Sequence, residues 1–253
     1  MSRIILITGA TSGIGKACAE KFSAAGDNVI ITGRREERLK ELQIELQAKY
    51  GAKVLPLCFD VQDKDAVFNL LGNLPAEWKK IDVLINNAGL ALGRDSFENA
   101  DIKDWETMLD TNVKGLMYVT KAVLPAMVAE KKGHIINLSS IAGKEVYENG
   151  NGYCASKFAV DAINRSLRID LLKHHIKVTA ICPGAVETEF SIVRYKGEKE
   201  KAAAAYTGFT PLYANDIADA AFYCAGLPAH VCINELVIMP VQQAGSYYFN
   251  KDQ

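Results

Sequence analysis

The stretch that most limits the fold of this chain spans residues 4–25, where an apolar run, a glycine-rich turn and a helical pattern follow one another. The apolar run is Ile4–Ile7, the turn at residues 8–15 reads Thr-Gly-Ala-Thr-Ser-Gly-Ile-Gly, and the helical pattern covers residues 16–25. Four apolar residues before a glycine turn are typical of a buried parallel strand. Glycines let a pyrophosphate approach the backbone, and the free N–H groups of a helix start attract negative charge. The stretch predicts a dinucleotide-binding turn; a purely structural glycine turn is the alternative.

Basic residues follow the second predicted strand, Val29–Ile31, where a dinucleotide fold contacts the adenosine ribose. The chain reads Thr32-Gly33-Arg34-Arg35 there, with no Asp or Glu at the end of the strand. An acidic residue at this place favours the free 2′-hydroxyl of NAD, whereas arginine favours the 2′-phosphate of NADP. A guanidinium can donate two hydrogen bonds to one phosphate. The pair therefore predicts NADP as the cofactor, and two solvated arginines are the alternative.

The rest of the chain alternates between strand and helix patterns. Further strands are predicted at residues 54–59, 81–85, 134–140, 177–181 and 236–239, and helices at 36–50, 63–71, 101–130 and 152–173. Such alternation indicates a parallel sheet with right-handed crossovers. No linker, repeat or composition break divides the chain. We therefore predict an α/β protein, a single-domain doubly wound Rossmann fold over residues 1–253, whose seven-stranded parallel sheet carries helices on both faces.

Polar residues follow two of these strands on the side of the sheet where ligands bind. Asp60-Val61 follows the third strand, where a carboxylate could meet the adenine amino group, and Asn86-Asn87-Ala88-Gly89 ends the fourth. A turn rich in Asn and Gly is the alternative for the second cluster. Asn112 lies inside the long helical pattern at 101–130, where its propensity is below average. It either faces solvent or has a specific role.

A phenol and an ammonium are held side by side by Tyr153 and Lys157. They stand four residues apart in the predicted helix at 152–173, so both lie on one face. A free phenol has a pKa near ~10 and is a poor base at neutral pH, but a fixed neighbouring cation lowers that pKa. Ser140 closes the fifth strand thirteen residues upstream and could hold a substrate oxygen. The spacing alone is weak evidence, because Tyr and Lys are common on helix surfaces.

Composition and charge exclude several other classes of protein. The net charge of −1 gives no basic surplus for nucleic acid, and no run of about 18 apolar residues indicates a membrane span. The six cysteines form no C-x-x-C pair and, like the four histidines, no metal-ligand spacing, so we expect no metal. Without a signal peptide, we expect a cytoplasmic protein. The aromatic tail, Tyr247-Tyr248-Phe249, predicts a subunit contact or terminal core packing.

In order and spacing, these motifs resemble the short-chain dehydrogenase/reductase family over nearly the whole chain. They are Thr8-Gly9-x-x-x-Gly13-x-Gly15, Asn86-Asn87-Ala88-Gly89, Asn112, Ser140, Tyr153-x-x-x-Lys157 and Pro183-Gly184. The resemblance implies four catalytic residues. Tyr153 is the general acid/base, Lys157 holds the nicotinamide ribose and lowers the tyrosine pKa, Ser140 orients the carbonyl, and Asn112 supports a water-linked proton path.

The cofactor site implied by the resemblance and by the strand ends is larger. Its residues are Gly9, Thr11, Ser12, Gly13, Ile14, Gly15, Arg34, Arg35, Asp60, Val61, Asn87, Ala88, Gly89, Tyr153, Lys157, Pro183, Gly184, Val186 and Thr188.

A narrower resemblance concerns the bacterial NADP-dependent 3-hydroxy acid dehydrogenases. It rests on residues 74–78, 87–93, 104–108 and 227–231, and on Thr188-Glu189-Phe190-Ser191 with Arg194. These enzymes act on serine, allo-threonine and related acids, and are typically tetramers. The segment after Pro183-Gly184 is about one residue shorter than expected from that group.

The substrate site is predicted at Ser140, Tyr153 and Arg194, the last within a substrate loop at about 184–212. A short hydroxy acid offers few apolar atoms, so its carboxylate must supply much of its binding, and a guanidinium suits a carboxylate best. Arg194 is the only arginine in that segment. An exposed loop charge is the alternative.

Three rival functions remain open from the sequence. A ketone or ketoacyl reductase of the same family would use the same catalytic residues on another substrate. A non-catalytic NADP-binding regulator would share the scaffold but is disfavoured by the intact Tyr153, Lys157 and Ser140. Nucleotide-sugar epimerases also use Tyr-x-x-x-Lys, but only 100 residues follow Tyr153, too few for a separate sugar-binding domain.

Overall fold

A wholly parallel sheet with the strand order β3-β2-β1-β4-β5-β6-β9 forms the centre of the computed structural model, which describes residues 2–252. Its strands are β1 (Ile4–Ile7), β2 (Asn28–Gly33), β3 (Val54–Cys58), β4 (Val83–Asn86), β5 (Gly133–Leu138), β6 (Ile176–Pro183) and β9 (Glu235–Ile238). The predicted seven-stranded parallel sheet is confirmed. Met1 and Gln253, the two ends of the predicted domain, lie outside the described residues.

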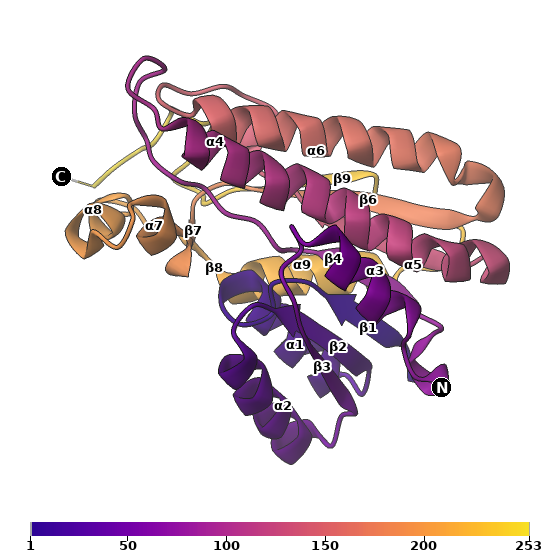
Figure 1. Ribbon diagram of the computed structural model, residues 1–253. Coiled ribbons are helices and arrows are strands. Elements are labelled where there is room, and N and C mark those ends of the chain that lie inside the picture. The colour runs from indigo at the N-terminus through magenta and orange to yellow at the C-terminus, as the bar shows by residue number, and fades with distance from the viewer. Residues whose placement is uncertain (1, 253) are drawn as a thin grey trace.

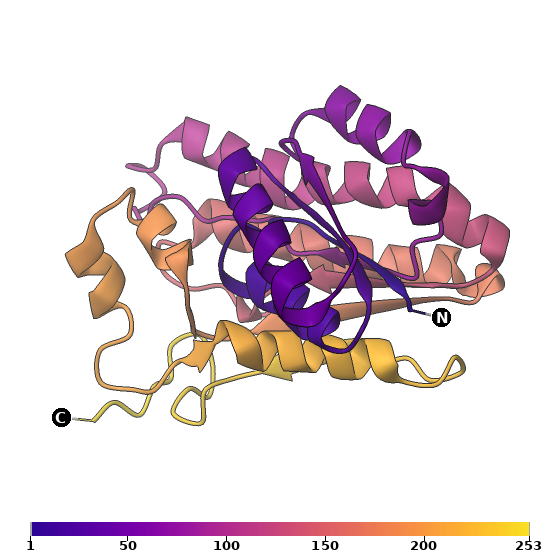
Figure 2. The same cartoon turned by 90° about the horizontal axis from the view of Figure 1, so that it is seen from below.

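Helices cover both faces of the sheet, as predicted (Figures 1 and 2). One face carries α1 (Gly13–Ala24), α2 (Glu36–Tyr50) and α9 (Ala214–Gly226). The other carries α3 (Lys64–Gly72), α5 (Leu116–Glu130) and α6 (Asn151–Asp170), with α4 (Ile102–Leu109) packed beside α6. No helix within residues 2–252 is long and apolar enough to cross a membrane.

Alternate residues of each central strand supply the two halves of the hydrophobic core. Ile5 and Ile7 of β1 pack under α1 and α9, whereas Leu6 between them packs under α3 and α5. All three side chains are completely buried. Successive side chains of a strand point to opposite faces, so a strand covered on both faces must be apolar throughout. The four-residue apolar run at 4–7 satisfies this requirement.

The predicted helix at 101–130 is interrupted by a π-helical turn. Helix α4 ends at Leu109, a π-helical segment covers Asp110–Gly115, and α5 continues from Leu116 with Pro125 inside it. Asn112, which the sequence marked as unusual for a helix interior, lies in this turn and is buried. Such turns widen the helix by one residue and occur often at functional sites.

Two other predicted helix boundaries differ from the structure by three residues, and the remaining helix and strand boundaries agree within two. Helix α1 begins at Gly13 rather than at residue 16, because the last glycines of the turn already have helical hydrogen bonding. Helix α6 ends at Asp170, and a short 3₁₀ turn at Leu172–His174 replaces the last residues of the predicted helix.

The predicted substrate loop at 184–212 contains structure of its own. Strand β7 (Val186–Glu187) pairs in parallel with β8 (Leu212–Tyr213), and the short helices α7 (Glu189–Arg194) and α8 (Lys199–Ala204) lie between them. Figure 1 shows α7 and α8 at the end of the molecule opposite the N-terminus, beyond the carboxyl end of β6. The loop therefore stands where a doubly wound sheet binds its ligands.

The glycine turn is packed too tightly for any larger residue at position 15. Gly9 and Gly13 have φ angles of +67° and +52°, which L side chains rarely adopt. A Cβ atom on Gly15 would collide with the carbonyl oxygen of Gly9 and would lie 2.5 Å from the side-chain nitrogen of Asn87. The third glycine is thus required by contact between the turn and the end of β4.

We predict that Gly15→Ala lowers the free energy of unfolding by about 1–3 kcal/mol, the usual cost of inserting a methyl group into a packed site. Chemical denaturation of the two proteins measures this difference. Gly72→Ala is the control, because a Cβ atom added there would meet no heavy atom within 4 Å and φ is ordinary. Equal stabilities for Gly15→Ala and wild type would contradict the packing argument.

Candidate active site

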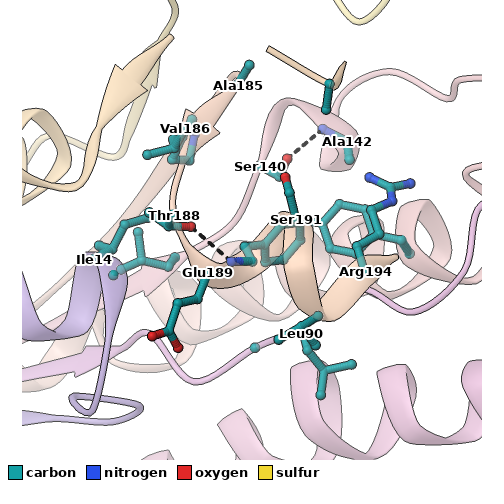
Figure 3. Close-up of a pocket in the computed structure, with 18 of the residues that line it drawn as sticks. Ile14, Leu90, Ser140, Ala142, Ala185, Val186, Thr188, Glu189, Ser191 and Arg194 are labelled. Atoms are coloured by element: carbon teal, nitrogen blue, oxygen red, sulfur yellow. Dashed lines mark hydrogen bonds between the residues drawn. The ribbon is translucent and has the colours of Figure 1, made fainter. Parts of the chain in front are cut away.

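A cavity of about 1070 Å³ runs along the carboxyl ends of β1, β4, β5 and β6. The sequence-predicted site residues converge on it: all of them line the cavity except Gly15 and Asn112, which lie behind its wall. Figure 3 shows part of this cavity, where residues of the glycine turn, the η3 turn (Ile141–Gly143) and the substrate loop face one another. Segments far apart in the sequence therefore form one site.

The glycine turn has the features of a phosphate cradle. Helix α1 starts directly after Ser12, and the Ser12 side chain does not cap it. The first N–H groups of α1 therefore lack a side-chain acceptor, and they carry the positive end of the helix dipole. Gly9 and Gly13 line the cavity without side chains. This part of the site fits a dinucleotide pyrophosphate.

Two arginines stand beside the cradle at the end of β2. Arg35 donates from Nε to Thr11 Oγ1 over 3.0 Å and from a terminal nitrogen to Ser12 Oγ over 2.8 Å. Arg34 pairs with Asp60 at 3.4 Å. Both guanidinium groups are exposed to the cavity, and no carboxylate stands at the end of β2 itself. These residues suit a second phosphate on the adenosine ribose.

Asp60 and Val61 lie together at the adenosine end of the cavity, as predicted. One oxygen of Asp60 accepts from the backbone N–H of Gln62 over 3.0 Å, and the other pairs with Arg34. Val61 is buried against Gly115 of the π-helical turn, where a Cβ on the glycine would collide with it. The contact of Asp60 with an adenine amino group stays a prediction.

The side chain of Asn87 joins the end of β4 to the glycine turn. Its nitrogen donates to the carbonyl oxygens of Thr8 and Gly9 over 2.8 and 3.2 Å. The hydroxyl of Thr8 in turn accepts from the backbone N–H groups of Asn87 and Ala88 over 3.0 and 2.9 Å. Asn87 therefore acts on the cradle by fixing its position.

Asn112 also holds backbone in place. Its amide oxygen accepts from the Leu90 N–H and its nitrogen donates to the Leu90 carbonyl, both over 2.8 Å, and the nitrogen also donates to Ser156 over 3.0 Å. A Cβ on Gly89 would lie 3.2 Å from the Asn112 oxygen and 3.7 Å from Lys157 Nζ. The π-helical turn thus brings this side chain between the end of β4 and α6. The water-linked proton path through Asn112 stays a prediction.

Tyr153 and Lys157 project from α6 into the interior of the site. Their relative exposures are 8% and 6%. Lys157 Nζ donates to the carbonyl oxygen of Leu138 over 2.9 Å and lies 5.8 Å from the centre of the Tyr153 ring. Ser140, two residues beyond Leu138, accepts from the backbone N–H of Ala142 over 3.1 Å (Figure 3). The predicted acid/base pair and hydroxyl are therefore assembled at the end of β5.

Burial dominates the protonation of this pair. It raises the pKa of Tyr153 well above its ordinary value, an effect that the neighbouring Tyr147 increases and that a hydrogen bond with Ser140 and the charge of Arg194 oppose. Burial also lowers the pKa of Lys157 to about 8, so its ammonium is still mostly charged at pH 7. The sequence predicted that Lys157 lowers the tyrosine pKa. Arg194 is the cation that opposes the rise in the tyrosine pKa here, whereas Lys157 donates to the Leu138 carbonyl; the effect of Lys157 on the tyrosine pKa stays a prediction.

Arg194 ends helix α7 and reaches into the cavity. Its guanidinium donates to the hydroxyl of Tyr147 over 2.8 Å and lies 5.4 and 5.5 Å from the ring centres of Tyr147 and Tyr153. Its Nε is buried and has no hydrogen-bond partner within residues 2–252. Phe190 of the same helix packs edge-on against Tyr153 at 5.6 Å. Arg194 is therefore half-buried at the end of a helix and lines the cavity, and its predicted contact with a substrate carboxylate stays a prediction.

Several lining residues were not predicted from the sequence. Tyr147 stands next to Arg194, and Arg94 lies over the other part of the Tyr147 ring at 5.8 Å. The tail contributes Tyr247, whose hydroxyl accepts from the Glu148 N–H, and Phe249, which stacks on Phe209 at 4.9 Å. The aromatic tail was the available signal, but it lines the cavity rather than packing in the core, with Tyr247 and Tyr248 exposed; the subunit contact stays a prediction.

A family comparison agrees with this geometry. The model of the short chain dehydrogenases matches residues 3–199, more than half of the chain. The chain belongs to this family.

Relatives and solved structures are similar over almost their full lengths. The NADP-dependent 3-hydroxy acid dehydrogenase YdfG of Salmonella typhi is 49% identical over 95% of this chain and 96% of its own. Sulfoacetaldehyde reductase 2 of Chromohalobacter salexigens is 46% identical over 98% of both chains. The closed form of a serine dehydrogenase complexed with NADP⁺ matches with a TM-score of 0.92 and 45% identity, over 99% of this chain and 100% of the other.

We predict that Tyr153→Phe reduces turnover of an alcohol or carbonyl substrate by at least about a hundredfold, because it removes the acid/base hydroxyl and keeps the ring. Steady-state kinetics measure the loss, and direct titration with the cofactor checks that binding survives. Tyr118→Phe, a change in α5 away from the cavity, is the matched control. Near-normal turnover of the Tyr153 variant would exclude the acid/base role.

Proposed function

We propose that the protein is an NADP-dependent oxidoreductase that interconverts a small 3-hydroxy acid, such as serine or allo-threonine, and the corresponding 3-oxo acid. The observation that carries this proposal is the position of Arg194 beside Tyr153, in one cavity with the phosphate cradle and Arg34 and Arg35. An anion-binding group thus lies next to the acid/base group. Two relatives support it by their names: the 49% identical protein is an NADP-dependent 3-hydroxy acid dehydrogenase, and the 45% identical structure is a serine dehydrogenase complexed with NADP⁺.

The residues of the chain divide the chemistry among them. The bound nicotinamide supplies the hydride acceptor or donor. Ser140 and Tyr153 would hold the substrate oxygen, and the Tyr153 hydroxyl takes or gives its proton. Lys157, charged and tied to the end of β5, would stabilise the phenolate when the proton has left. Phe190, packed on Tyr153, would exclude water from it, which strengthens the charge interactions inside the cavity.

Arg194 sets the substrate class in this proposal. Its guanidinium already donates to Tyr147 and keeps a buried Nε–H without a partner among the described residues. A substrate carboxylate would satisfy that donor, and a planar guanidinium binds a carboxylate through two parallel hydrogen bonds. An uncharged ketone or ketoacyl substrate would leave it unsatisfied, so that alternative is weaker. A non-catalytic regulator is also a weaker alternative, because Tyr153, Lys157 and Ser140 are all present and a regulator would not need them.

A second candidate substrate is a short sulfonated aldehyde. Two arginines, Arg94 and Arg194, flank Tyr147 at 5.8 and 5.4 Å, and a sulfonate has three acceptor oxygens for such donors. The 46% identity to a sulfoacetaldehyde reductase also favours it. Comparing kcat/KM for sulfoacetaldehyde reduction and for 3-hydroxy acid oxidation, each with its own uncharged analogue, distinguishes the two.

We further propose that the chain forms one domain, works in the cytoplasm and assembles as a homotetramer. Exposed apolar side chains on α6, among them Phe158 and Ile169, and on β9 and the segment after it, among them Val237 and Val241, support an assembly with two kinds of contact. Light scattering of the purified protein tests the tetramer, and a monomer at micromolar concentration would contradict it.

We predict that Arg34→Asp raises the KM for NADP by at least about tenfold, because it places a carboxylate beside the 2′-phosphate. The ratio of kcat/KM with NADP to kcat/KM with NAD should fall accordingly. Kinetics with both cofactors measure the change, and kcat at saturating NADP serves as the internal control. A wild-type enzyme with equal kcat/KM for the two cofactors would contradict the assignment of NADP.

We predict that Arg194→Met raises the KM for serine-like acids by about tenfold or more, roughly 1.4 kcal/mol, with little effect on an uncharged ketone or alcohol with the same reacting carbon. The paired substrates control for damage to α7. Equal losses on both would indicate a misfolded loop, and no loss on either would remove Arg194 from the substrate site.

A further inference from the structure

A carboxylate of the substrate loop occupies arginines at the cofactor end of the cavity. Glu189, the first residue of α7, accepts from Arg35 over 3.0 Å and from Arg38 over 2.9 and 3.1 Å through its two oxygens. Arg38 lies in the first turn of α2, three and four residues after Arg35 and Arg34, which precede the helix. It was not predicted as a site residue. The three residues link the substrate loop to α2 across the mouth of the phosphate cradle.

All three nitrogens of Arg35 donate in this arrangement, through four of the five N–H groups of the guanidinium. Nε and one terminal nitrogen donate to Thr11 and Ser12, and the other terminal nitrogen donates to Glu189. A phosphate that binds this guanidinium through two N–H groups must therefore replace at least one of these acceptors. Glu189 is the acceptor with a full negative charge, so it is the one that a dianionic phosphate repels most strongly.

Space for a phosphate adjoins these side chains. A second cavity of about 340 Å³ lies between the glycine turn and α2. Its polar lining is Thr11, Ser12, Lys16, Arg38, Glu41, Glu45 and Glu189, so the phosphate would bind at the Arg38 and Glu189 side, away from the other two carboxylates. Glu189 lines the large cavity as well. It therefore stands in the wall between the two, with its carboxylate ionised at neutral pH: burial raises its pKa, but the hydrogen bonds from Arg35 and Arg38 outweigh burial and lower it.

The same residue begins the helix that carries the substrate-side contacts. Figure 3 shows Glu189 and Arg194 at opposite ends of α7, with the Glu189 carboxylate directed away from Arg194. Thr188 accepts from the backbone N–H of Phe190 over 3.2 Å, so the start of α7 is tied to the residue that packs on Tyr153. Breaking the ion pairs of Glu189 with the arginines would therefore change the positions of Phe190, which packs on Tyr153, and of Arg194.

We propose that Glu189 is a specificity-determining residue that competes with the cofactor 2′-phosphate for Arg35 and Arg38, and that this exchange couples the phosphate to the position of α7. The proposal rests on the proposed use of NADP. It adds Arg38 to the phosphate-binding residues. It also means that the ion pairs of Glu189 with Arg35 and Arg38 stay intact when the bound cofactor has no 2′-phosphate.

Titration calorimetry with adenosine 2′,5′-bisphosphate and with adenosine 5′-monophosphate tests the competition without any catalysis. In Glu189→Gln, the Kd of the bisphosphate should fall roughly threefold or more at low salt, with a smaller gain at high salt, and the Kd of the monophosphate should not change. Glu187→Gln, which removes an equal charge from β7, is the matched control and should affect the two ligands equally.

The outcomes separate this proposal from the cofactor assignment. Unchanged or weaker bisphosphate binding in Glu189→Gln, with a clear wild-type preference for the bisphosphate, would overturn the role of Glu189 alone. A wild-type protein that binds both ligands equally would overturn the assignment of NADP together with the proposal.

Hydrogen exchange tests the coupling to α7. In the wild type, the bisphosphate should change the exchange of the amides at residues 190–195, whereas the monophosphate should not. In Glu189→Gln the two ligands should give the same exchange pattern. Identical wild-type patterns with both ligands would show that the 2′-phosphate does not act on α7.

Discussion

The hydrogen bonds between Thr8 and Asn87 hold together the part of the structure on which the rest of the site depends. They join the end of β1 to the end of β4, the neighbouring strands at which the order of the sheet reverses. At that point the connections lead to opposite faces, which leaves a crevice above the strand ends. The glycine turn, the acid/base residues of α6 and the substrate loop all open into this crevice. Without the contact, the cradle would have no fixed position relative to Tyr153.

Burial of ionisable groups is the main electrostatic feature of the site. Tyr153 and Lys157 are almost inaccessible, and burial disfavours the charged form of each. The hydrogen bond to the Leu138 carbonyl offsets part of the cost of burying the Lys157 ammonium. The nearby Arg194 guanidinium offsets part of the cost of ionising Tyr153. The segment at 184–212 thus places a cation beside the predicted acid/base residue, and in our proposal the same cation binds the substrate. In the same helix, Glu189 faces the arginines at the other end of the cavity, so one short helix contacts both ends of the site.

The sequence predicted the sheet and the cradle because both follow from local patterns. Runs such as Ile4–Ile7 must be apolar throughout when a strand is covered on both faces, and only glycine fits at position 15. Contacts between distant segments were not predicted. The π-helical turn at 110–115 has a single apolar side chain, Val113, so it offers no periodicity, and only Asn112 indicated something unusual there.

The directions of the side chains could not be predicted from the sequence either. The spacing of Tyr153 and Lys157 gave a shared helix face, but not the carbonyl of β5 that Lys157 contacts or the cation that lies on Tyr153. Tyr147, Arg94 and the tail residue Tyr247 reach the site through irregular segments, which have no periodicity to interpret. Arg38 and Glu189 meet across 151 residues of sequence.

The central claim is that the cavity selects a short hydroxy acid by its charge and oxidises it with NADP⁺. The most direct measurement is kcat/KM of the wild-type protein for serine, 3-hydroxypropanoate and 1-propanol with NADP⁺ in excess. The account predicts oxidation of the acids with kcat/KM at least about tenfold above that of the uncharged alcohol, the scale of one satisfied charge interaction. Failure to oxidise either acid, or equal values for propanol, would contradict it.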